Sequence, residues 1–234
     1  VYRNKRDESL GLPNFERKVD THRRFKENFQ FFSGKSILDY GCGDGDFLKK
    51  TQDFAKSISG VELQIDYVNN LKNIGISCFN DIDNVKENSI DTCFSFHVLE
   101  HLLDPIETLH KINNKLVENG IVIIEVPHAN DFLLSVAKID TFKKFTLWSQ
   151  HLVLHTRDSL KRFLEVGGFC DIMIKGIQRY PISNHLNWFI NNRPSGHKSF
   201  YSFFDTPILS QEYEKVLASI DATDTLIAIA KKKI

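Results

Sequence analysis

The chain has 234 residues, of which 41% are hydrophobic, an ordinary share for a globular protein with a substantial core. Lys and Arg together number 30, as do Asp and Glu, so no net charge attracts the chain to nucleic acid or to an acidic membrane. This balance argues against a long polyanion bound by charge alone. We expect a single domain spanning residues 1–234.

The cysteines indicate a reducing compartment. Cys42, Cys78, Cys93 and Cys170 are widely spaced, as small buried thiols are, and form neither a disulfide framework nor a zinc motif. The longest uninterrupted apolar run, Leu226–Ala230, is far too short to cross a bilayer, and no charged and then apolar leader opens the chain. We therefore expect a cytoplasmic protein without a membrane span.

Residues 1–34 are polar and basic, and their apolar side chains are spaced as in one or two amphipathic helices. These apolar residues are Phe15, Val19, Phe25, Phe29 and Phe32. We expect this N-terminal helical segment to pack against the edge of a sheet.

The stretch Ser36–Phe47 predicts a strand, a tight turn and the start of a helix. Glycines at 41, 43 and 45 let the chain turn sharply, so that the first amides of the helix point at a ligand above the strand end. Asp46 occupies the position of the last glycine in a dinucleotide-binding loop, and Asp39 places a carboxylate where it would repel phosphate. The loop suits a cationic or zwitterionic ligand better.

The run Leu38–Gly45, read as Leu-Asp-Tyr-Gly-Cys-Gly-Asp-Gly, resembles the first motif of class I S-adenosylmethionine-dependent methyltransferases. Their ligand carries a sulfonium, an ammonium and a carboxylate. The resemblance covers about residues 36–178 and the last strand. It implies a doubly wound α/β fold of the Rossmann-like methyltransferase type, with a seven-stranded, mostly parallel sheet whose last strand is antiparallel. It also implies S-adenosylmethionine as the cofactor.

Glu62 ends the second predicted strand, residues 57–61, about 20 residues after the loop. An acid at this place can accept hydrogen bonds from both hydroxyls of a ribose, although a helix N-cap is the alternative. By position, the resemblance also implies that Asp81 and Ile82 contact the adenine. The predicted cofactor-binding residues are Asp39, Gly41, Gly43, Gly45, Glu62, Leu63, Asp81, Ile82 and Phe96.

The remaining elements alternate as an open α/β sheet requires. We expect helices over 46–53, 64–73 and 156–166, and strands over 74–79, 89–96, 121–126, 169–178 and 223–230. Residues 91–102 resemble the family's fourth-strand motif. A further helix starts at the Asp104 cap with Pro105 in its first turn, and Asn119-Gly120 ends it.

Two segments are too long for simple connections. Residues 129–155 leave the carboxyl end of a central strand and carry Phe132, Phe142, Phe145 and Trp148, so we predict a substrate lid. Residues 179–222 are rich in aromatic side chains and form either a second covering segment or a dimer surface.

Four histidines fall near the expected ligand crevice: His97, His101, His128 and His151. A hydroxyl acceptor calls for a base that titrates near neutrality, so His151, His128 and His97 are the candidate catalytic residues. His97, Glu100 and His101 have the i, i+3, i+4 spacing that puts side chains on one face of a helix.

Glu100, His101 and His151 also resemble part of the arrangement by which RNA-end 2′-O-methyltransferases, and in part the ubiquinone-pathway O-methyltransferases, hold a divalent cation. His97 stands where that arrangement has an acid, which weakens the case for Mg²⁺ in particular. Glu-His at this point also occurs in family members thought to need no metal. The prediction therefore assigns no metal ligand.

The sequence predicts an enzyme that transfers a methyl group from S-adenosylmethionine to a small or medium acceptor, a hydroxyl of a sugar or glycan precursor. Aromatic faces stack on sugar rings, but they fit a quinone equally. The alternatives are a non-catalytic cofactor-binding or scaffold module, and a quinone, secondary-metabolite or RNA-end O-methyltransferase. Asp39 and Asp46 argue against a nicotinamide-dependent oxidoreductase. We expect no nucleic-acid partner, and a homodimer is one reading of residues 179–222.

Overall fold

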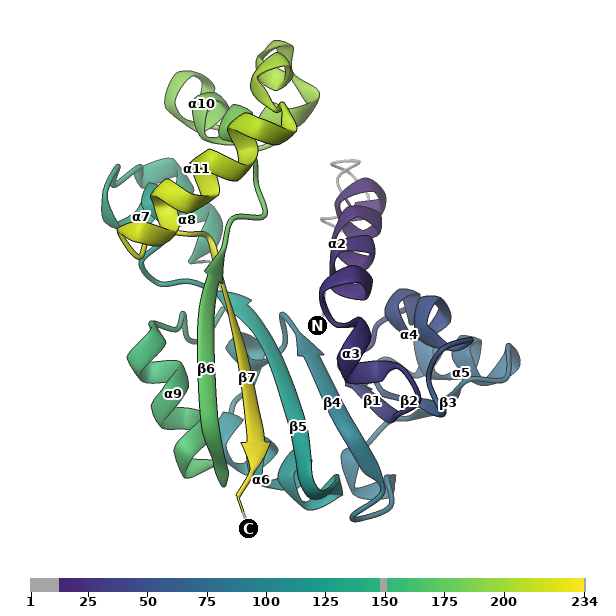
Figure 1. The fold of residues 1–234 in the computed structure, drawn as a ribbon. Coiled ribbons are helices and arrows are strands. Elements are labelled where there is room, and N and C mark those ends of the chain that lie inside the picture. The colour runs from purple at the N-terminus through teal and green to yellow at the C-terminus, as the bar shows by residue number, and fades with distance from the viewer. Residues whose placement is uncertain (1–12, 148–150, 234) are drawn as a thin grey trace. The chain divides into compact units, whose positions relative to one another are not determined.

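The computed structural model describes residues 13–147 and 151–233 and contains a seven-stranded sheet (Figure 1). The strand order is β3-β2-β1-β4-β5-β7-β6. The strands are β1 (Ser36–Tyr40), β2 (Ser57–Val61), β3 (Ser77–Phe79), β4 (Ile90–Phe96), β5 (Leu116–Pro127), β6 (Phe169–Ile177) and β7 (Thr225–Lys232). Strand β7 runs antiparallel to both β5 and β6, whereas β1, β2, β3 and β4 pair in parallel. The predicted methyltransferase-type fold is confirmed.

The chain divides into two compact units, which we describe separately. The first unit runs to Phe94 and includes Lys115–Gly120. Its helices in the described chain are α2 (Pro13–Glu27), α3 (Phe29–Phe32), α4 (Asp46–Thr51) and α5 (Ile65–Asn73), with a 3₁₀ turn η1 (Ile82–Asn84). The expected N-terminal helices are therefore present. The side chain of Phe15 lies outside the described residues.

The second unit comprises Ser95–Asn114 and the chain from Ile121 onward. Its described helices are α6 (Pro105–Lys115), α7 (Phe132–Ser135), α8 (Asp140–Thr146), α9 (Arg157–Val166), α10 (Ile182–Asn191) and α11 (Pro207–Ser219). Three 3₁₀ turns complete it: η2 (Leu99–His101), η3 (Gly196–Lys198) and η4 (Phe200–Phe204). The expectation of a single domain stays a prediction, as does the covering role of residues 129–155 and 179–222. Trp148 lies outside the described residues.

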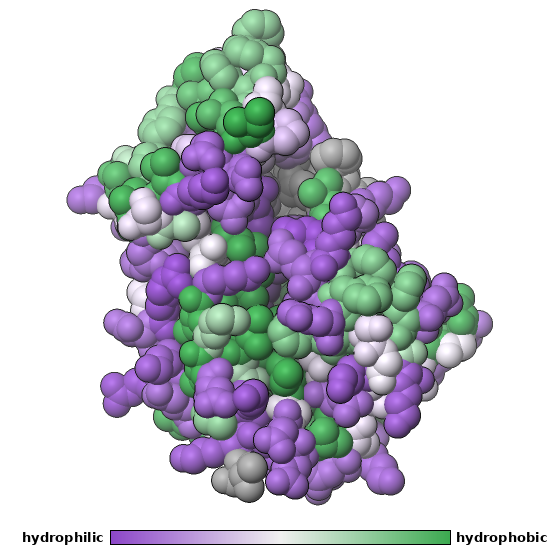
Figure 2. All heavy atoms as spheres, in the orientation of Figure 1, coloured by the Kyte–Doolittle hydropathy of each residue, from purple (hydrophilic) through white to green (hydrophobic). Residues whose placement is uncertain are grey.

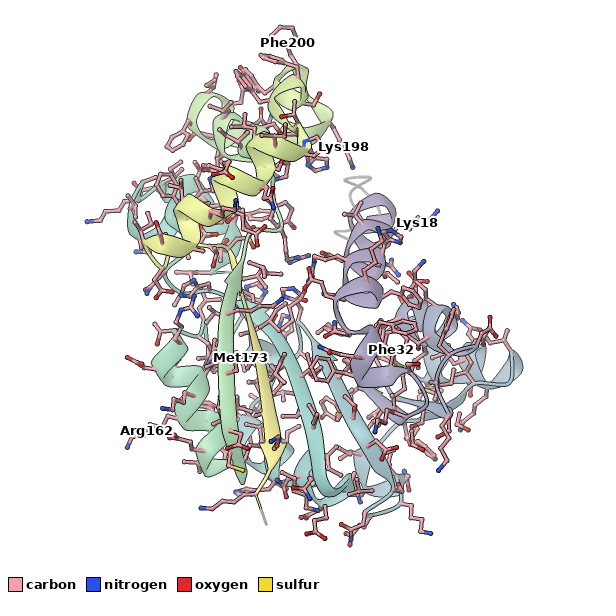
Figure 3. All side chains as sticks on the ribbon, viewed as in Figure 1. Lys18, Phe32, Arg162, Met173, Lys198 and Phe200 are labelled. Atoms are coloured by element: carbon pink, nitrogen blue, oxygen red, sulfur yellow. The ribbon has the colours of Figure 1, made fainter. Side chains whose placement is uncertain are left out.

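Packed aromatic rings form part of the core of the first unit. Phe32, labelled in Figure 3, is fully buried, and its ring centroid lies 6.0 Å from that of Phe47. Phe47 in turn lies 4.9 Å from Phe94 on β4, with the rings edge to face. Such pairs add to the free energy of burial, so they hold helix α4 firmly against the sheet. The loop between β1 and α4 therefore rests on a close-packed base.

The core of the second unit lies around β5 and β7. Val122, Ile123, Ile124 and Val126 of β5 are each at most 1% exposed. Helix α9 begins as predicted at the Thr156 cap, because the Thr156 hydroxyl accepts from the Ser159 amide and the Ser159 hydroxyl accepts from the Thr156 amide. Gly167 ends this helix, also as predicted.

Three predicted boundaries are wrong. Strand β3 begins at Ser77 rather than Ile74, because Gly75 adopts φ +82° at the end of α5 and the Ile76 amide donates back to the Leu71 carbonyl. Helix α6 ends at Lys115, four residues before Asn119, and β5 begins at Leu116. The apolar residues at the end of the predicted helix are therefore strand residues.

The segment around α10, η4 and α11 exposes apolar side chains (Figure 2). Phe200 and Ile208 are 84% and 78% exposed, and Figure 3 shows Phe200 pointing away from the protein. Trp188 of α10 is by contrast buried. Separately, no helix in the described residues combines the length and apolar character needed to cross a membrane.

Candidate functional site

The glycine loop of the first unit needs its glycines. Gly41, Gly43 and Gly45 have φ values of +80°, +55° and +76°, in the left-handed region that favours glycine. Gly45 is also the N-cap of α4, and a Cβ there would lie 2.4 Å from Cδ2 of Leu71. The sequence places the turn correctly, and the backbone gives the physical reason for each glycine.

Glu62, the residue that follows β2, joins the glycine loop to the start of α5. Its Oε2 accepts a hydrogen bond from the Gly43 amide at 3.0 Å, and its Oε1 accepts one from the Gln64 amide at 2.9 Å. A carboxylate has about four lone-pair positions, so Glu62 can accept further hydrogen bonds from a ribose. The alternative of an N-cap at Glu62 is wrong, because Gln64 is the N-cap of α5. The ribose contact stays a prediction.

Asp39 is a buried carboxyl group at the end of β1, with only 3% of the residue exposed. Burial raises the pKa of Asp39 to about 7; the carboxylate of Glu62 raises it further, and Arg24 opposes the rise. A cationic ligand beside Asp39 would favour the ionised carboxylate. The structure therefore gives Asp39 the environment of an acid whose charge a bound cation would stabilise.

The other predicted cofactor residues occupy varied environments. Asp81 is exposed and caps η1, because its Oδ1 accepts from the Asp83 amide at 2.9 Å. Ile82 is buried, whereas Leu63 is 60% exposed. Phe96 ends β4 and belongs to the second unit. No contact of these four with a cofactor is tested, so their role stays a prediction.

In the second unit, the predicted helical face of His97, Glu100 and His101 is wrong. His97 has φ +57°, which no α-helix contains, and only the 3₁₀ turn η2 follows it. The side chains nevertheless approach one another, because His97 Nδ1 lies 3.4 Å and His101 Nε2 lies 3.8 Å from Oε1 of Glu100. A left-handed residue followed by a tight turn brings them together instead of a helix.

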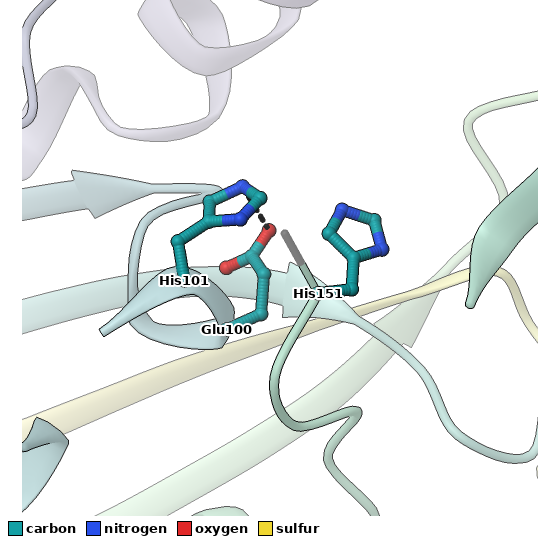
Figure 4. Close-up of side chains that lie close together, drawn as sticks. All are labelled: Glu100, His101 and His151. Atoms are coloured by element: carbon teal, nitrogen blue, oxygen red, sulfur yellow. Dashed lines mark ion pairs between the residues drawn. The ribbon is translucent and has the colours of Figure 1, made fainter. Parts of the chain in front are cut away.

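His151 joins this group from a distant part of the chain, as Figure 4 shows. Its ring centroid lies 4.9 Å from that of His101. The backbone holds the two segments together, because the Leu152 amide donates to the Glu100 carbonyl at 2.8 Å. Ligand atoms of Glu100, His101 and His151 all lie within 4.8 Å of one another. The structure thus gathers three of the residues that the sequence analysis singled out.

The proton of His151 is fixed by a backbone contact. Nδ1 lies 2.8 Å from the Thr146 carbonyl oxygen, which only accepts, so Nδ1 donates and Nε2 carries the lone pair of the ring. Burial lowers the pKa of His151, and Glu100 opposes that change. Burial opposes the ionisation of Glu100 as well, but His97 and His101 outweigh it and lower the pKa of Glu100.

Sequence reasoning missed Arg179 and Glu125, which surround His97. Nη1 of Arg179 lies 2.9 Å from Nε2 of His97, and Oε1 of Glu125 lies 3.1 Å from the same nitrogen. The same nitrogen of His97 therefore faces a donor, the guanidinium of Arg179, and an acceptor, the carboxylate of Glu125. Glu125 is 1% exposed within the apolar run of β5, and that isolated acid was the available signal.

His128 lies apart from these contacts, at the end of β5. Its Nδ1 donates to the Thr223 carbonyl at 2.9 Å, and its Nε2 lies 3.7 Å from Oδ2 of Asp221. His128 is 1% exposed, and burial lowers its pKa. His128 and His151 therefore both carry the ring lone pair at Nε2, but His128 is buried whereas His151 is partly exposed.

Known proteins resemble this chain in sequence and in fold. The family model described as "Methyltransferase domain" matches residues 15–172. An S-adenosylmethionine-dependent methyltransferase from Archaeoglobus fulgidus has 20% identity and a TM-score of 0.62, with 92% of this chain and 94% of that chain covered. A Mesorhizobium loti S-adenosylmethionine-dependent methyltransferase has 16% identity and a TM-score of 0.59, covering 92% and 100%.

A third solved structure is phosphoethanolamine N-methyltransferase 2 of Haemonchus contortus in complex with S-adenosyl-L-methionine. It has 17% identity and a TM-score of 0.62, and the match covers 92% of this chain and 53% of that chain. This chain therefore corresponds to about half of that protein. No curated protein matches the sequence significantly. At these identities, the solved structures show a shared fold.

Proposed function

Because this chain belongs to the methyltransferase-domain family and is a class I S-adenosylmethionine-dependent methyltransferase, we propose that it methylates a hydroxyl group of a sugar or glycan precursor. Methyl transfer from a sulfonium is an in-line displacement by the acceptor atom. The protein must hold the acceptor close to the methyl group and remove the acceptor's proton.

The proposed cofactor site is the loop of the first unit. Gly41, Gly43 and Gly45 let the backbone approach the ligand, and the carboxylate of Glu62 takes the ribose hydroxyls while it keeps its bond to Gly43. Asp39 lies at the strand end below and faces the cationic part of the ligand. Four further residues belong to the proposed cofactor-binding set by their position in the sequence: Leu63, Asp81, Ile82 and Phe96.

The observation that carries the choice of a hydroxyl acceptor is the orientation of His151. A neutral hydroxyl keeps its proton at neutral pH, so its methylation gains from a group that accepts that proton. The hydrogen bond from Nδ1 to Thr146 leaves the lone pair on Nε2, and the buried carboxylate of Glu100 lies within the same cluster. This cluster can draw a proton from an acceptor.

The saccharide is supported by exposed aromatic faces in the second unit. Phe145 of α8 is 46% exposed, and its ring centroid lies 5.3 Å from that of the buried Trp188. Phe189 of α10 is 49% exposed. Aromatic rings held on a firm base suit stacking against the apolar face of a sugar ring.

The test is label transfer from methyl-labelled S-adenosylmethionine to an acceptor panel: nucleotide sugars, free glycans, phosphoethanolamine, a hydroquinone and short RNA. We expect label on a saccharide as a methyl ether, lost in the His151→Ala variant and kept in His110→Ala, whose side chain is exposed on α6. Label on an amine, a hydroquinone or RNA with none on a saccharide would overturn the proposal.

A further inference from the structure

Two buried thiols lie in contact beside the glycine loop of the first unit. Sγ of Cys42 lies 3.8 Å from Sγ of Cys78, a distance at which one thiol donates a weak hydrogen bond to the other. Cys42 is 8% exposed and Cys78 is 1% exposed, and all four cysteines of the chain are free. The proposed function uses neither of these two oxidisable groups.

The sheet brings the two sulfurs together over Gly60. Gly60 of β2 is the direct parallel partner of Cys78 on β3, so these two positions face the same side of the sheet. A Cβ at Gly60 would stand 2.5 Å from Sγ of Cys42, so this sulfur occupies the space of the missing side chain. The contact between the thiols therefore depends on three positions that are separate in the sequence and adjacent in the fold.

The two thiols differ in how readily they ionise. The hydrogen bond with Cys78 and burial raise the pKa of the Cys42 thiol, whereas the same hydrogen bond lowers the pKa of the Cys78 thiol. Cys42 is therefore the donor, and Cys78 is the sulfur that ionises first. The thiolate is the form that attacks an oxidant. A thiolate in contact with a second thiol is the arrangement from which a disulfide forms.

We propose that Cys42 and Cys78 form a reversible disulfide that weakens cofactor binding, with a hydroperoxide as the oxidant. The Cys78 thiolate attacks one oxygen of hydrogen peroxide, which breaks the O–O bond, leaves a sulfenic acid and, with one proton, releases water. The Cys42 sulfur then displaces the sulfenic oxygen, which leaves as a second water with the thiol proton. Two thiols thus lose two electrons and two protons, and the peroxide is reduced to two waters. A dithiol reductant restores both thiols by exchange.

The disulfide alters the glycine loop because one of its sulfurs belongs to a loop residue. Bond formation draws the sulfurs well inside their present contact of 3.8 Å. Cys78 is held within β3, whereas Cys42 stands between two glycines with positive φ, so the loop adjusts more easily than the strand. Movement of Cys42 shifts Gly43, whose amide donates to Glu62. The effect on the cofactor rests on its placement in this loop under the proposed function.

Thiol counting and peptide mass mapping of the full chain, before and after hydrogen peroxide treatment, test whether the disulfide forms. We use the Cys170→Ser variant, because the half-buried Cys170 could oxidise separately and obscure the count. With three of the four cysteines left, we expect three free thiols before treatment and one after it, with a peptide link between Cys42 and Cys78. Dithiothreitol should restore three. Treated protein without this link would overturn the proposal.

Calorimetry with S-adenosylhomocysteine tests the effect on the cofactor. The reduced Cys170→Ser protein should bind, the oxidised form should bind more weakly by about 10-fold or more, and dithiothreitol should restore the affinity. Addition of Cys78→Ser removes one sulfur of the pair, so this protein should keep its affinity through peroxide treatment. Addition of Cys93→Ser provides the matched control, because Cys93 is a buried cysteine on β4, and this protein should still lose affinity.

The two measurements separate the ways in which the proposal can fail. Equal affinity of the reduced protein and of the protein with the mapped disulfide would overturn the regulation and leave the cofactor placement intact. Absence of binding by the reduced protein would overturn the cofactor placement together with the regulation. Loss of affinity in Cys78→Ser equal to that in the Cys93→Ser control would show that oxidation acts elsewhere, and would also overturn the proposal.

Discussion

The carboxylate of Glu62 accepts a hydrogen bond from the backbone amide of Gly43 at 3.0 Å. This contact joins the acid that follows β2 to the middle of the glycine loop that follows β1. The second carboxylate oxygen of Glu62 accepts a hydrogen bond from the Gln64 amide. Hydrogen bonds within the protein therefore connect the loop to Glu62 and to the start of α5. A preorganised site loses less conformational freedom on binding, so Glu62 contributes to affinity through the loop as well as through a ribose contact.

Asp39 should make stability depend on pH. Its pKa of about 7 in the folded protein exceeds the ordinary aspartate value of 3.8, so between these values the folded state holds a proton that the unfolded chain has lost. The stability contributed by this group is present below pH 4 and is lost as pH rises through 7. Asp39→Asn should therefore gain stability relative to wild type between pH 5 and 7.5, by up to about 3 kcal/mol.

Denaturant unfolding of the wild type and of Asp39→Asn, each at pH 5 and at pH 7.5, measures this difference in stability. Comparison with the wild type removes the contribution of other buried acids, such as Asp131, which both proteins share. If the difference in unfolding free energy between the two proteins is the same at pH 5 and 7.5, the raised pKa of Asp39 is wrong.

Gly60 should be needed for cofactor affinity although it lies on β2 rather than in the loop. A Cβ at Gly60 would stand 2.5 Å from Sγ of Cys42, the residue between the first two loop glycines. Gly60→Ala should displace Cys42 and weaken binding of S-adenosylhomocysteine by about 10-fold, a cost typical of overpacking. Adding Cys42→Ala should recover most of the loss. Additive losses in the double variant would show that the two positions are not coupled.

His151→Ala should separate turnover from cofactor binding. Loss of a proton-accepting side chain lowers rates by about 10² to 10⁴, whereas the loop and Glu62 are unaltered. Single-turnover label transfer measures the rate, and calorimetry with S-adenosylhomocysteine measures the affinity. His110→Ala serves as the control for a histidine removed elsewhere. A variant that keeps the wild-type rate would make His151 a structural residue.

Much of the fold could be predicted because its signals are local. The sequence predicts β1 and β2 well, since each is a short segment bounded by a turn or a helix signal. The start of β3 could not be placed, because the apolar residues Ile74 and Ile76 lie in the turn after α5, around Gly75 with φ +82°. Periodicity does not distinguish a short buried strand from a hydrophobic helix end.

The site was only partly predictable for a different reason. Glu100, His101 and His151 were found from residue type and spacing, although the reason given for the first two was wrong, since His97 is left-handed rather than helical. The contact between Arg179 and His97 joins residues far apart in the sequence, and no local pattern encodes it. Such long-range contacts require the fold.

The most direct test is calorimetric titration of the wild type and Glu62→Gln with S-adenosylhomocysteine, with Glu118→Gln as the matched control. We expect saturable binding by the wild type and the control, and affinity lower by about 10- to 100-fold in Glu62→Gln, since hydrogen bonds to a charged group contribute about 1.5 to 3 kcal/mol. Equal affinity in all three proteins would contradict the placement of the cofactor beside Gly43 and Glu62.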